Sequence, residues 1–273
     1  MKKCGTLIFS LLLAALCSCN PQSNAKSTQT DAKPEPVAEQ PKETPVTLCD
    51  TIPLDSYSPD SPTLDYSIML EPLKLNNDAA TEKAVMSISY VICGRECSSL
   101  TQASESYINR LTGSYQELRP DYIDIKANNG QPHWLNHSYS LKGTAGNGYK
   151  GSANYLLEFY EYTGGAHPYS YNLAFSFDPN DGHEITLDGI MKENYEEALL
   201  SIITRELMSH FNVNSIEELD NYLFNYKELF ISKNFMLGAD SLIILYNKYE
   251  IAPYAIGDII LNIEYDKLKE IMK

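Results

Sequence analysis

The chain has 273 residues, of which 36 are acidic and 21 are lysine or arginine, giving a formal net charge of −15. This acidity argues against a nucleic-acid partner, because the phosphates would be repelled rather than neutralised. It favours encounter with basic partners, unless it serves only to maintain solubility.

The first 18 residues are expected to be a signal peptide. Two early lysines precede the apolar run Leu7 to Leu16, which is too short to span a bilayer as a helix. The run ends in Leu16-Cys17-Ser18-Cys19, which resembles a bacterial lipobox and implies that Cys19 is lipidated. We therefore predict a lipid-anchored, extracytoplasmic protein of the cell envelope, in the outer membrane or at the cell surface. An uncleaved N-terminal anchor is the alternative.

A tether is expected after the lipid. Residues 20–47 contain five prolines and almost no large apolar side chains, so they cannot bury enough surface to offset the entropy of ordering. We assign residues 19–50 to the lipidated cysteine and this disordered tether. Removing residues 1–18 would take away two lysines and no acidic residue, which changes the net charge from −15 to −17.

The first part of the globular region, residues 51–150, mixes strands and helices. Asn77 or Asp78 is a suitable N-cap, and Val85, Ile88 and Ile92 recur at helical spacing. The predicted elements are a strand over 64–75, helices over 77–92 and 100–118, a strand over 134–141 and a flexible glycine-rich connection over 143–152.

The second part, residues 151–273, contains the clearest strand pattern. From Tyr169 to Asp178, large apolar and small or polar residues alternate, which indicates a strand with one buried face. Ser215 followed by Glu218 fits a capping box. The predicted elements are strands over 155–162, 169–177, 242–246 and 259–265, a short extension over 184–187, helices over 193–211 and 215–224, and a short C-terminal helix.

These elements are grouped rather than strictly alternating, which favours an α+β fold. We expect a largely antiparallel sheet with helices packed on one side, preceded by a smaller α/β subdomain.

Three cysteines follow the lipid cysteine, so at most one disulfide can form among Cys49, Cys93 and Cys97. Cys93 and Cys97 are four residues apart in a predicted helical stretch, and adjacent helical turns rarely present good disulfide geometry. Pairing of Cys49 with one of them is equally plausible. Buried structural thiols are the more common alternative to a redox or metal role.

Two sequence blocks carry a family resemblance: YEYTGGAHPYSYNLAFSFDPNDGHEITLDGI from Tyr160 to Ile190, and YEIAPYAIGDIILNIEYDKL from Tyr249 to Leu268. They resemble the extracytoplasmic domain shared by the anti-sigma factor RsiV and the non-catalytic region of the peptidoglycan deacetylase PdaC. The resemblance implies a PdaC-like N-terminal subdomain over 51–150 and an RsiV-like domain over 151–273. Nothing in the sequence matches the deacetylase metal site, so no enzymatic activity is implied.

The candidate ligand-binding residues lie around the motif TGGAHP. Gly164 and Gly165 allow positive φ, and His167 could exchange hydrogen bonds at the sheet edge. Tyr162 and Tyr169 flank the motif with rings that carry a polar tip. The alternative is a purely structural hairpin loop that the histidine locks.

We predict no metal site, no cofactor and no catalytic residues. His133 and His137 have HxxxH spacing, but Pro132 suggests an extended segment and the zincin glutamate is missing. The aspartates Asp178, Asp181 and Asp188 do not follow a calcium-loop pattern.

Two functions remain in view. The first is a binding module for lysozyme, the ligand of the best-known relative, or for another basic envelope protein. The second is a peptidoglycan-binding or carbohydrate-binding accessory module, with a glycan-modifying hydrolase as a weaker third option. Salt should weaken the first kind of binding more than the second.

Overall fold

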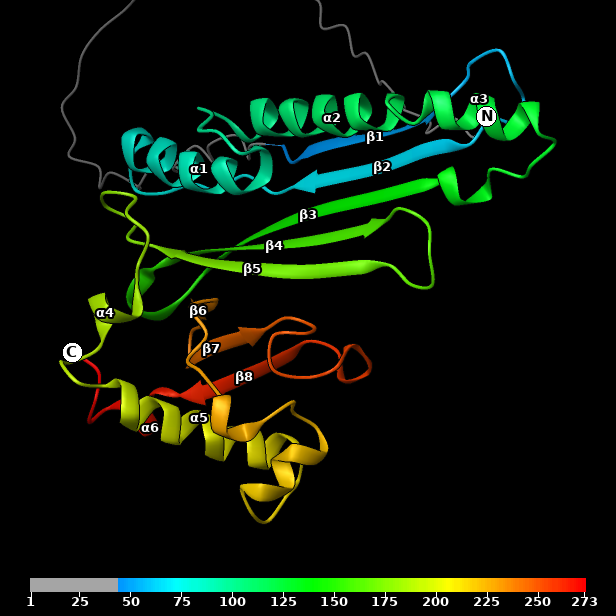
Figure 1. Cartoon of the computed structure of the whole chain (residues 1–273). Coiled ribbons are helices and arrows are strands. Elements are labelled where there is room, and N and C mark those ends of the chain that lie inside the picture. The colour runs from blue at the N-terminus through cyan, green and yellow to red at the C-terminus, as the bar shows by residue number, and fades with distance from the viewer. Residues whose placement is uncertain (1–43) are drawn as a thin grey trace, which may run out of the picture. The chain divides into compact units, whose positions relative to one another are not determined.

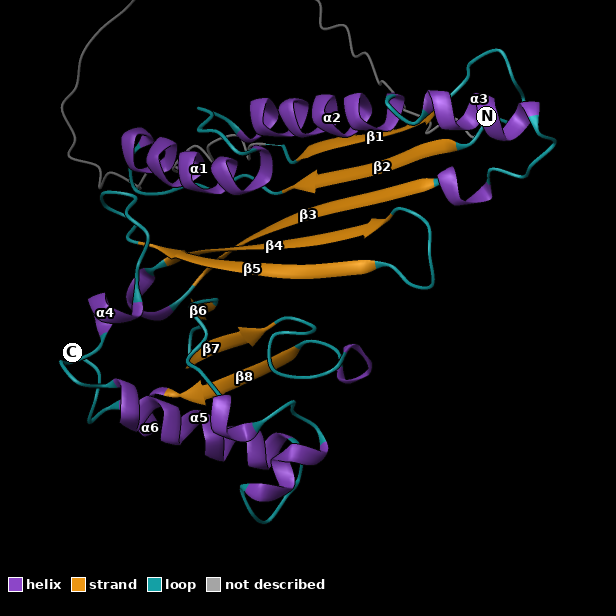
Figure 2. Cartoon of the chain, viewed as in Figure 1, coloured by secondary structure: helices purple, strands orange, loops and turns teal. Residues whose placement is uncertain are grey.

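The computed structural model describes residues 44–273. The predicted signal peptide, Cys19 and most of the predicted tether lie outside these residues. The predicted α+β class is confirmed: the chain forms one five-stranded and one three-stranded sheet, with helices beside each (Figures 1 and 2). The larger sheet comes first in the chain.

The five strands of the larger sheet follow the order β1-β2-β3-β4-β5. All neighbours are antiparallel except β2 and β3, which run parallel because three helices form the crossover between them. The strands are β1 (Val46–Pro53), β2 (Thr63–Leu70), β3 (His137–Asn147), β4 (Ala153–Tyr162) and β5 (Tyr169–Phe177).

Two predicted boundaries fall inside this sheet. Residues 46–50, which we had assigned to the disordered tether, belong to strand β1 and pair with β2. The boundary between residues 150 and 151 lies between β3 and β4, which pair along their whole length. The division of the chain into two family segments at that point stays a prediction.

The crossover helices are α1 (Asp78–Cys93), α2 (Leu100–Gln116) and α3 (Arg119–Ala127). Asn77 caps α1 as predicted, since its side chain accepts a hydrogen bond from the Ala80 N–H, and Ser99 caps α2 in the same way. The sequence analysis missed α3, a short helix with a single buried side chain, Tyr122.

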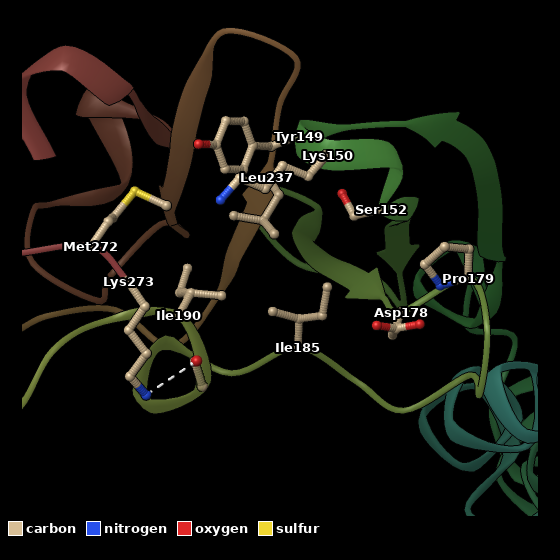
Figure 3. A pocket seen from close by; sticks show the side chains of 11 residues that line it. Tyr149, Lys150, Ser152, Asp178, Pro179, Ile185, Ile190, Leu237, Met272 and Lys273 are labelled. Atoms are coloured by element: carbon tan, nitrogen blue, oxygen red, sulfur yellow. Dashed lines mark hydrogen bonds between the residues drawn. The ribbon is translucent and has the colours of Figure 1, made fainter. Parts of the chain in front are cut away.

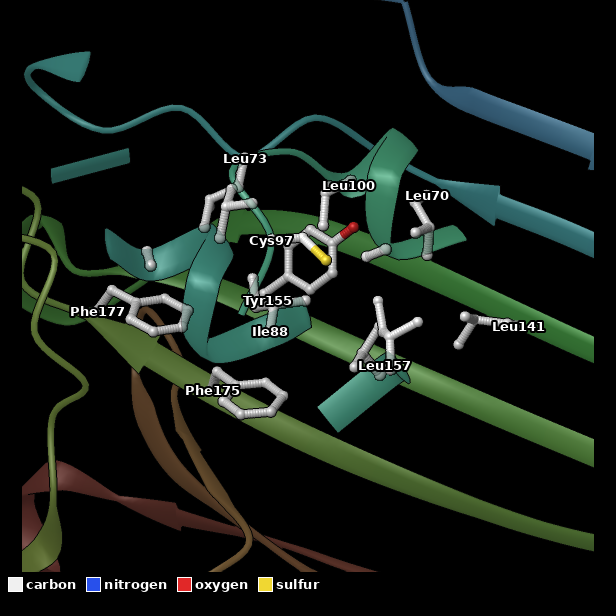
Figure 4. Close-up of a cluster of buried hydrophobic side chains, with 14 of the residues drawn as sticks. Leu70, Leu73, Ile88, Cys97, Leu100, Leu141, Tyr155, Leu157, Phe175 and Phe177 are labelled. Carbon is white, nitrogen blue, oxygen red and sulfur yellow. The ribbon is translucent and has the colours of Figure 1, made fainter. Parts of the chain in front are cut away.

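The helices cover one face of the larger sheet. Residues at alternate positions of β2 and β4, such as Leu70 and Tyr155, are fully buried in one cluster with Ile88 of α1 (Figure 4). Burial of this apolar face is the main favourable term for the subdomain. The other face of the sheet carries exposed side chains, among them Met69 and Tyr160.

The smaller sheet has the order β6-β7-β8 and is antiparallel throughout. Ile259, Leu261 and Ile263 of β8 are buried and pack with Leu199 and Ile203 of α5, as their spacing predicted. The elements are α4 (Leu187–Ile190), α5 (Glu196–His210), β6 (Phe235–Leu237), β7 (Ser241–Tyr246), β8 (Ile259–Glu264) and α6 (Tyr265–Leu268).

Three local predictions are wrong. Trp134 lies in a 3-10 turn (His133–Leu135) and not in a strand, which begins at His137. The glycine-rich segment is strand as far as Asn147, because Gly143 leaves room for the Tyr155 ring, whose hydroxyl would lie 2.4 Å from an added Cβ. The helix expected over 215–224 is only a 3-10 turn (Glu217–Asn221), and the Glu218 carboxylate accepts from Asn214 N–H.

Residues 187–268, which form the three-stranded sheet and its helices and are called the smaller subdomain below, supply side chains that satisfy the free edge of β5. Asn234 accepts a hydrogen bond from Ala174 N–H at 2.8 Å and donates to Asn172 C=O at 2.8 Å. The Asn247 side chain accepts a hydrogen bond from Asn172 N–H at 2.6 Å and donates one to Asn172 C=O at 3.0 Å. The two amides thus replace a sixth strand.

Further along β5 the junction is buried. Ser176 Oγ donates to Asn154 Oδ1 at 2.8 Å and accepts from Leu237 N–H at 2.9 Å, while Asn154 Nδ2 donates to Leu237 C=O at 2.7 Å. These three hydrogen bonds join β4, β5 and β6, and each of the side chains of Asn154 and Ser176 has a partner.

Replacing Asn234 with alanine should destabilise the protein by about 1–3 kcal/mol, because the Ala174 N–H is then left unpaired at a partly buried site. Urea unfolding should show a lower midpoint with an unchanged slope. Asn221→Ala is the matched control, since the exposed Asn221 amide only donates to Glu218 C=O within its own turn. Equal losses for both variants would contradict this account of the junction.

Candidate ligand-binding surface at the β4–β5 hairpin

The TGGAHP motif forms the loop between β4 and β5. Gly164 has φ of 87° and lies against the Trp134 backbone, where an added Cβ would be 2.6 Å from the Trp134 carbonyl oxygen. Gly165 has φ of 104° and open space around it. The Tyr162 hydroxyl donates to Gly165 C=O at 3.1 Å, which holds the turn closed.

His167 connects the loop to the β7–β8 connection. Its ring stacks on that of Tyr254 with centroids 4.2 Å apart and an interplanar angle of 25°. The Tyr254 hydroxyl donates to Pro168 C=O at 3.1 Å, and His167 Nδ1 lies 3.1 Å from the same oxygen. The hairpin loop is therefore fixed by a partner 87 positions further along the chain.

Two exposed rings lie near the hairpin loop, and one of them, Tyr249, extends this stack. Tyr249 is 50% exposed and lies 5.7 Å from Tyr254 between ring centroids. Tyr169 is 42% exposed and lies 5.7 Å from Tyr171, which in turn stacks on Phe159 at 4.5 Å. Partly exposed rings with polar tips, held by buried neighbours, are suited to contact another molecule.

The predicted binding residues do not enclose a single cavity. Tyr169 pairs with Glu161 across the two strands, so these two side chains share one face of the sheet. Tyr162, the next residue after Glu161, points to the opposite face. The exposed rim of the hairpin therefore has two parts: His167 with the tyrosines of the β7–β8 connection, and Tyr169 with Glu161 on the helix-covered side of the sheet.

The charges near this rim are of both signs. Lys248 Nζ lies 2.9 Å from Asp258 Oδ2 and also donates to Ser170 Oγ at 2.9 Å, so this lysine is engaged within the protein. Glu161 is exposed beside Tyr169. Burial raises the pKa of Tyr171, and the Glu161 charge raises it further, so its hydroxyl stays neutral near pH 7.

Cavities also lie elsewhere in the described part of the chain. One, of about 220 Å³, has apolar walls that include Ile185, Ile190 and Leu237, with Ser152 and Lys273 among its polar lining (Figure 3). Lys273 Nζ donates to the Asp188 and Gly189 carbonyls at 2.8 and 3.2 Å.

A second cavity, of about 480 Å³, has three carboxylates and one lysine among its lining residues: Glu184, Asp188, Glu196 and Lys233. Burial, followed by a hydrogen bond to Asp188, raises the pKa of Tyr195 at its edge to about 12. None of the predicted binding residues lines either cavity.

The histidines of the HxxxH pattern do not converge. His133 is exposed in the 3-10 turn, whereas His137 packs on the Tyr115 ring at 5.3 Å between centroids. Burial lowers the pKa of His137, so the neutral ring is favoured.

The aspartates are occupied within turns. Asp178 accepts from the Asn180 N–H, and Asp181 accepts from both His183 N–H and His183 Nδ1, which lowers the Asp181 pKa. Within residues 44–273, no three histidine, cysteine or acidic side chains are grouped so as to hold a metal ion.

Sequence reasoning located the hairpin loop but missed what it contacts. The rings of Tyr249 and Tyr254 come from an irregular segment without periodicity, so their proximity to His167 had no signal in the sequence. The block YEIAPYAIGD contains both tyrosines and was noticed only through the family resemblance.

Comparison with known proteins supports the fold. Residues 185–266 match the model of DUF3298, a family described as proteins of unknown function. The description of that family names no catalytic activity. No curated protein matches the chain.

Two solved structures share the architecture. A member of the DUF3298 family from Bacteroides fragilis NCTC 9343 has a TM-score of 0.74 at 23% identity, covering 84% of this chain and 92% of its own. A DUF3298 family protein from Pseudomonas aeruginosa PAO1 has a TM-score of 0.53 at 16% identity, covering 84% of this chain and 94% of its own. At these identities the likeness shows the fold alone.

None of the helices described over residues 44–273 is both long and apolar enough to cross a membrane.

The two glycines of the loop should differ in their tolerance of alanine. Gly165→Ala should cost about 1–2 kcal/mol, for the positive φ alone. Gly164→Ala should cost about 1–3 kcal/mol more, because its Cβ also overlaps the Trp134 carbonyl oxygen. Urea unfolding of the two variants measures the difference. Equal stabilities would show that the close approach to Trp134 is not rigid.

Proposed function

We propose that this chain is a lipid-anchored, extracytoplasmic binding domain that recognises a basic protein of the cell envelope. Lysozyme is the first candidate, because the sequence blocks resemble those of RsiV and PdaC. In this proposal the lipid on Cys19 holds the domain at the membrane, and the domain itself has no catalytic role.

The observation that carries the proposal is the exposed aromatic rim of the β4–β5 hairpin on a strongly acidic body. Residues 1–43 contain five lysines and four acidic residues, so residues 44–273 carry a formal net charge of −15 − 1 = −16. Such a charge steers a basic protein toward the domain. The exposed rings of Tyr249 and of Tyr169, the latter with Glu161 as its cross-strand neighbour, then provide the kind of contacts that are enriched at protein interfaces.

The second candidate, binding to cell-wall glycan, is favoured by the same exposed rings together with Trp134, which is 50% exposed. Aromatic rings can stack on sugars without help from charge. The two functions therefore differ in their response to salt, since a Debye length of about 10 Å at 0.1 M ionic strength screens steering between proteins.

The test uses a soluble form, residues 20–273, with lysozyme and with purified peptidoglycan in parallel. We expect lysozyme binding that weakens markedly between low and moderate salt, measured by calorimetry. Retention on peptidoglycan that persists in salt would favour the glycan function instead. Absence of lysozyme binding at both salt concentrations would refute the proposal.

Tyr249→Ala should weaken lysozyme binding about tenfold or more, because it removes a half-exposed ring from the rim. Tyr57→Ala is the matched control, since Tyr57 is 92% exposed and lies in the β1–β2 connection. If both variants bind like the unchanged protein, the rim is not the contact surface.

A further inference from the structure

The cysteines at the end of α1 lie close together. Cys93 Sγ and Cys97 Sγ are 3.7 Å apart, and both are free thiols. The S–S bond of a disulfide is about 2.05 Å long, so the two sulfur atoms would have to approach each other by about 1.7 Å to form one. The binding proposal above makes no use of this pair.

A sharp turn, and not a continuous helix, brings the thiols together. We had expected both cysteines on one helical stretch, but α1 ends at Cys93 and Gly94 takes up φ of 76°. Gly94 N–H donates to Tyr90 C=O at 2.8 Å, which completes the cap. The chain then reverses, so that Cys97 returns over the last turn of the helix.

Ser89 holds this turn in place. Its hydroxyl oxygen accepts from Cys97 N–H at 2.7 Å and donates to Met86 C=O at 2.8 Å. Ser89 is fully buried, so the two hydrogen bonds fix the backbone of Cys97 relative to α1. The thiols are therefore positioned before any bond forms between them.

Among residues 44–273 the third cysteine, Cys49, lies on the other side of the sheet. In β1, Leu48 pairs with the buried Ile68 and so points to the helix-covered face, which places the neighbouring Cys49 on the opposite face. Cys49 is exposed there. The sheet itself thus separates Cys49 from the pair beside α1.

We propose that Cys93 and Cys97 form a redox-active pair that a small-molecule or protein disulfide closes into an intramolecular disulfide. The Cys93 thiolate attacks one sulfur of the oxidant's disulfide, giving a mixed disulfide and releasing one thiolate. Cys97 then loses its proton and attacks Cys93 Sγ, which releases the second thiolate. The pair loses two electrons and two protons, and the oxidant is reduced to two thiols.

The different solvent exposure of the two thiols determines which of them attacks the oxidant first. Cys93 is partly exposed, whereas Cys97 is 6% exposed and belongs to the core cluster of the larger sheet. Burial raises the pKa of the Cys97 thiol, and the hydrogen bond with Cys93 adds to this effect. Cys97 is therefore a poor first nucleophile and is suited to resolve the mixed disulfide beside it.

The experiment starts from the full chain, reduced and then equilibrated with oxidised and reduced glutathione. After alkylation of the remaining thiols and digestion with trypsin without reductant, Cys93 lies in the peptide of residues 84–95, Cys97 in 96–110 and Cys49 in 43–74. We expect the first two peptides to be recovered linked and Cys49 to be alkylated. Links to Cys49, or glutathione adducts without closure, would overturn the proposal.

Two cysteine variants test the order of attack, and two serine variants test the positioning. Cys97→Ser should accumulate a glutathione adduct on Cys93, whereas Cys93→Ser should leave Cys97 largely unmodified in the folded protein. Ser89→Ala should lower the effective concentration of the pair several-fold, measured as the glutathione ratio at half closure, whereas Ser87→Ala, two residues away on the same helix, should not change it. Equal adduct formation on both cysteines would contradict the assigned order.

Discussion

The architecture depends on how the free edge of β5 is satisfied. An edge strand exposes a row of unpaired N–H and C=O groups, and such groups invite pairing with another chain. Here the amides of Asn234 and Asn247 approach Asn172 and Ala174 with the donor and acceptor pattern of a strand. The edge is closed without a continuous sheet, and the two subdomains are joined through hydrogen bonds rather than through a shared apolar core.

That junction also determines the geometry of the hairpin rim. Asn247 follows β7 directly, and the same connection carries Tyr249, Tyr254 and Asp258. Because Asn247 binds the β5 backbone, the rest of the connection is brought alongside the β4–β5 loop, where Tyr254 stacks on His167. The rim thus exists only when both subdomains are folded and in contact.

Much of the fold was predictable because it follows from local rules. The alternation in β5 and β8 and the cap at Asn77 depend on residues near in sequence, and all three features are found. The wrong predictions concern segments whose secondary structure depends on contacts with residues far away in the sequence. Gly143 belongs to a strand through its pairing with β4, at a position where Tyr155 leaves no room for a Cβ, and three-residue β6 pairs with β7.

The same distinction applies to the candidate site. The sequence identified the loop with Gly164 and His167, since its glycines and proline mark a turn. It could not show that Tyr162 and Tyr169 point to opposite faces of the sheet, or that Tyr254 covers His167. These facts depend on strand register and on a contact between subdomains, and neither has a short-range signal.

The distribution of side chains on the larger sheet favours the rim over the broad open face as a contact surface. That face carries the exposed cross-strand ion pair of Lys142 and Glu158, with Nζ and Oε2 2.7 Å apart, and its exposed apolar residues Met69 and Tyr160 lie on different strands. Scattered apolar residues among paired charges are ordinary for a solvated surface. At the rim, by contrast, partly exposed rings are held in place by stacking and by hydrogen bonds to the loop backbone, so little side-chain freedom would be lost on binding.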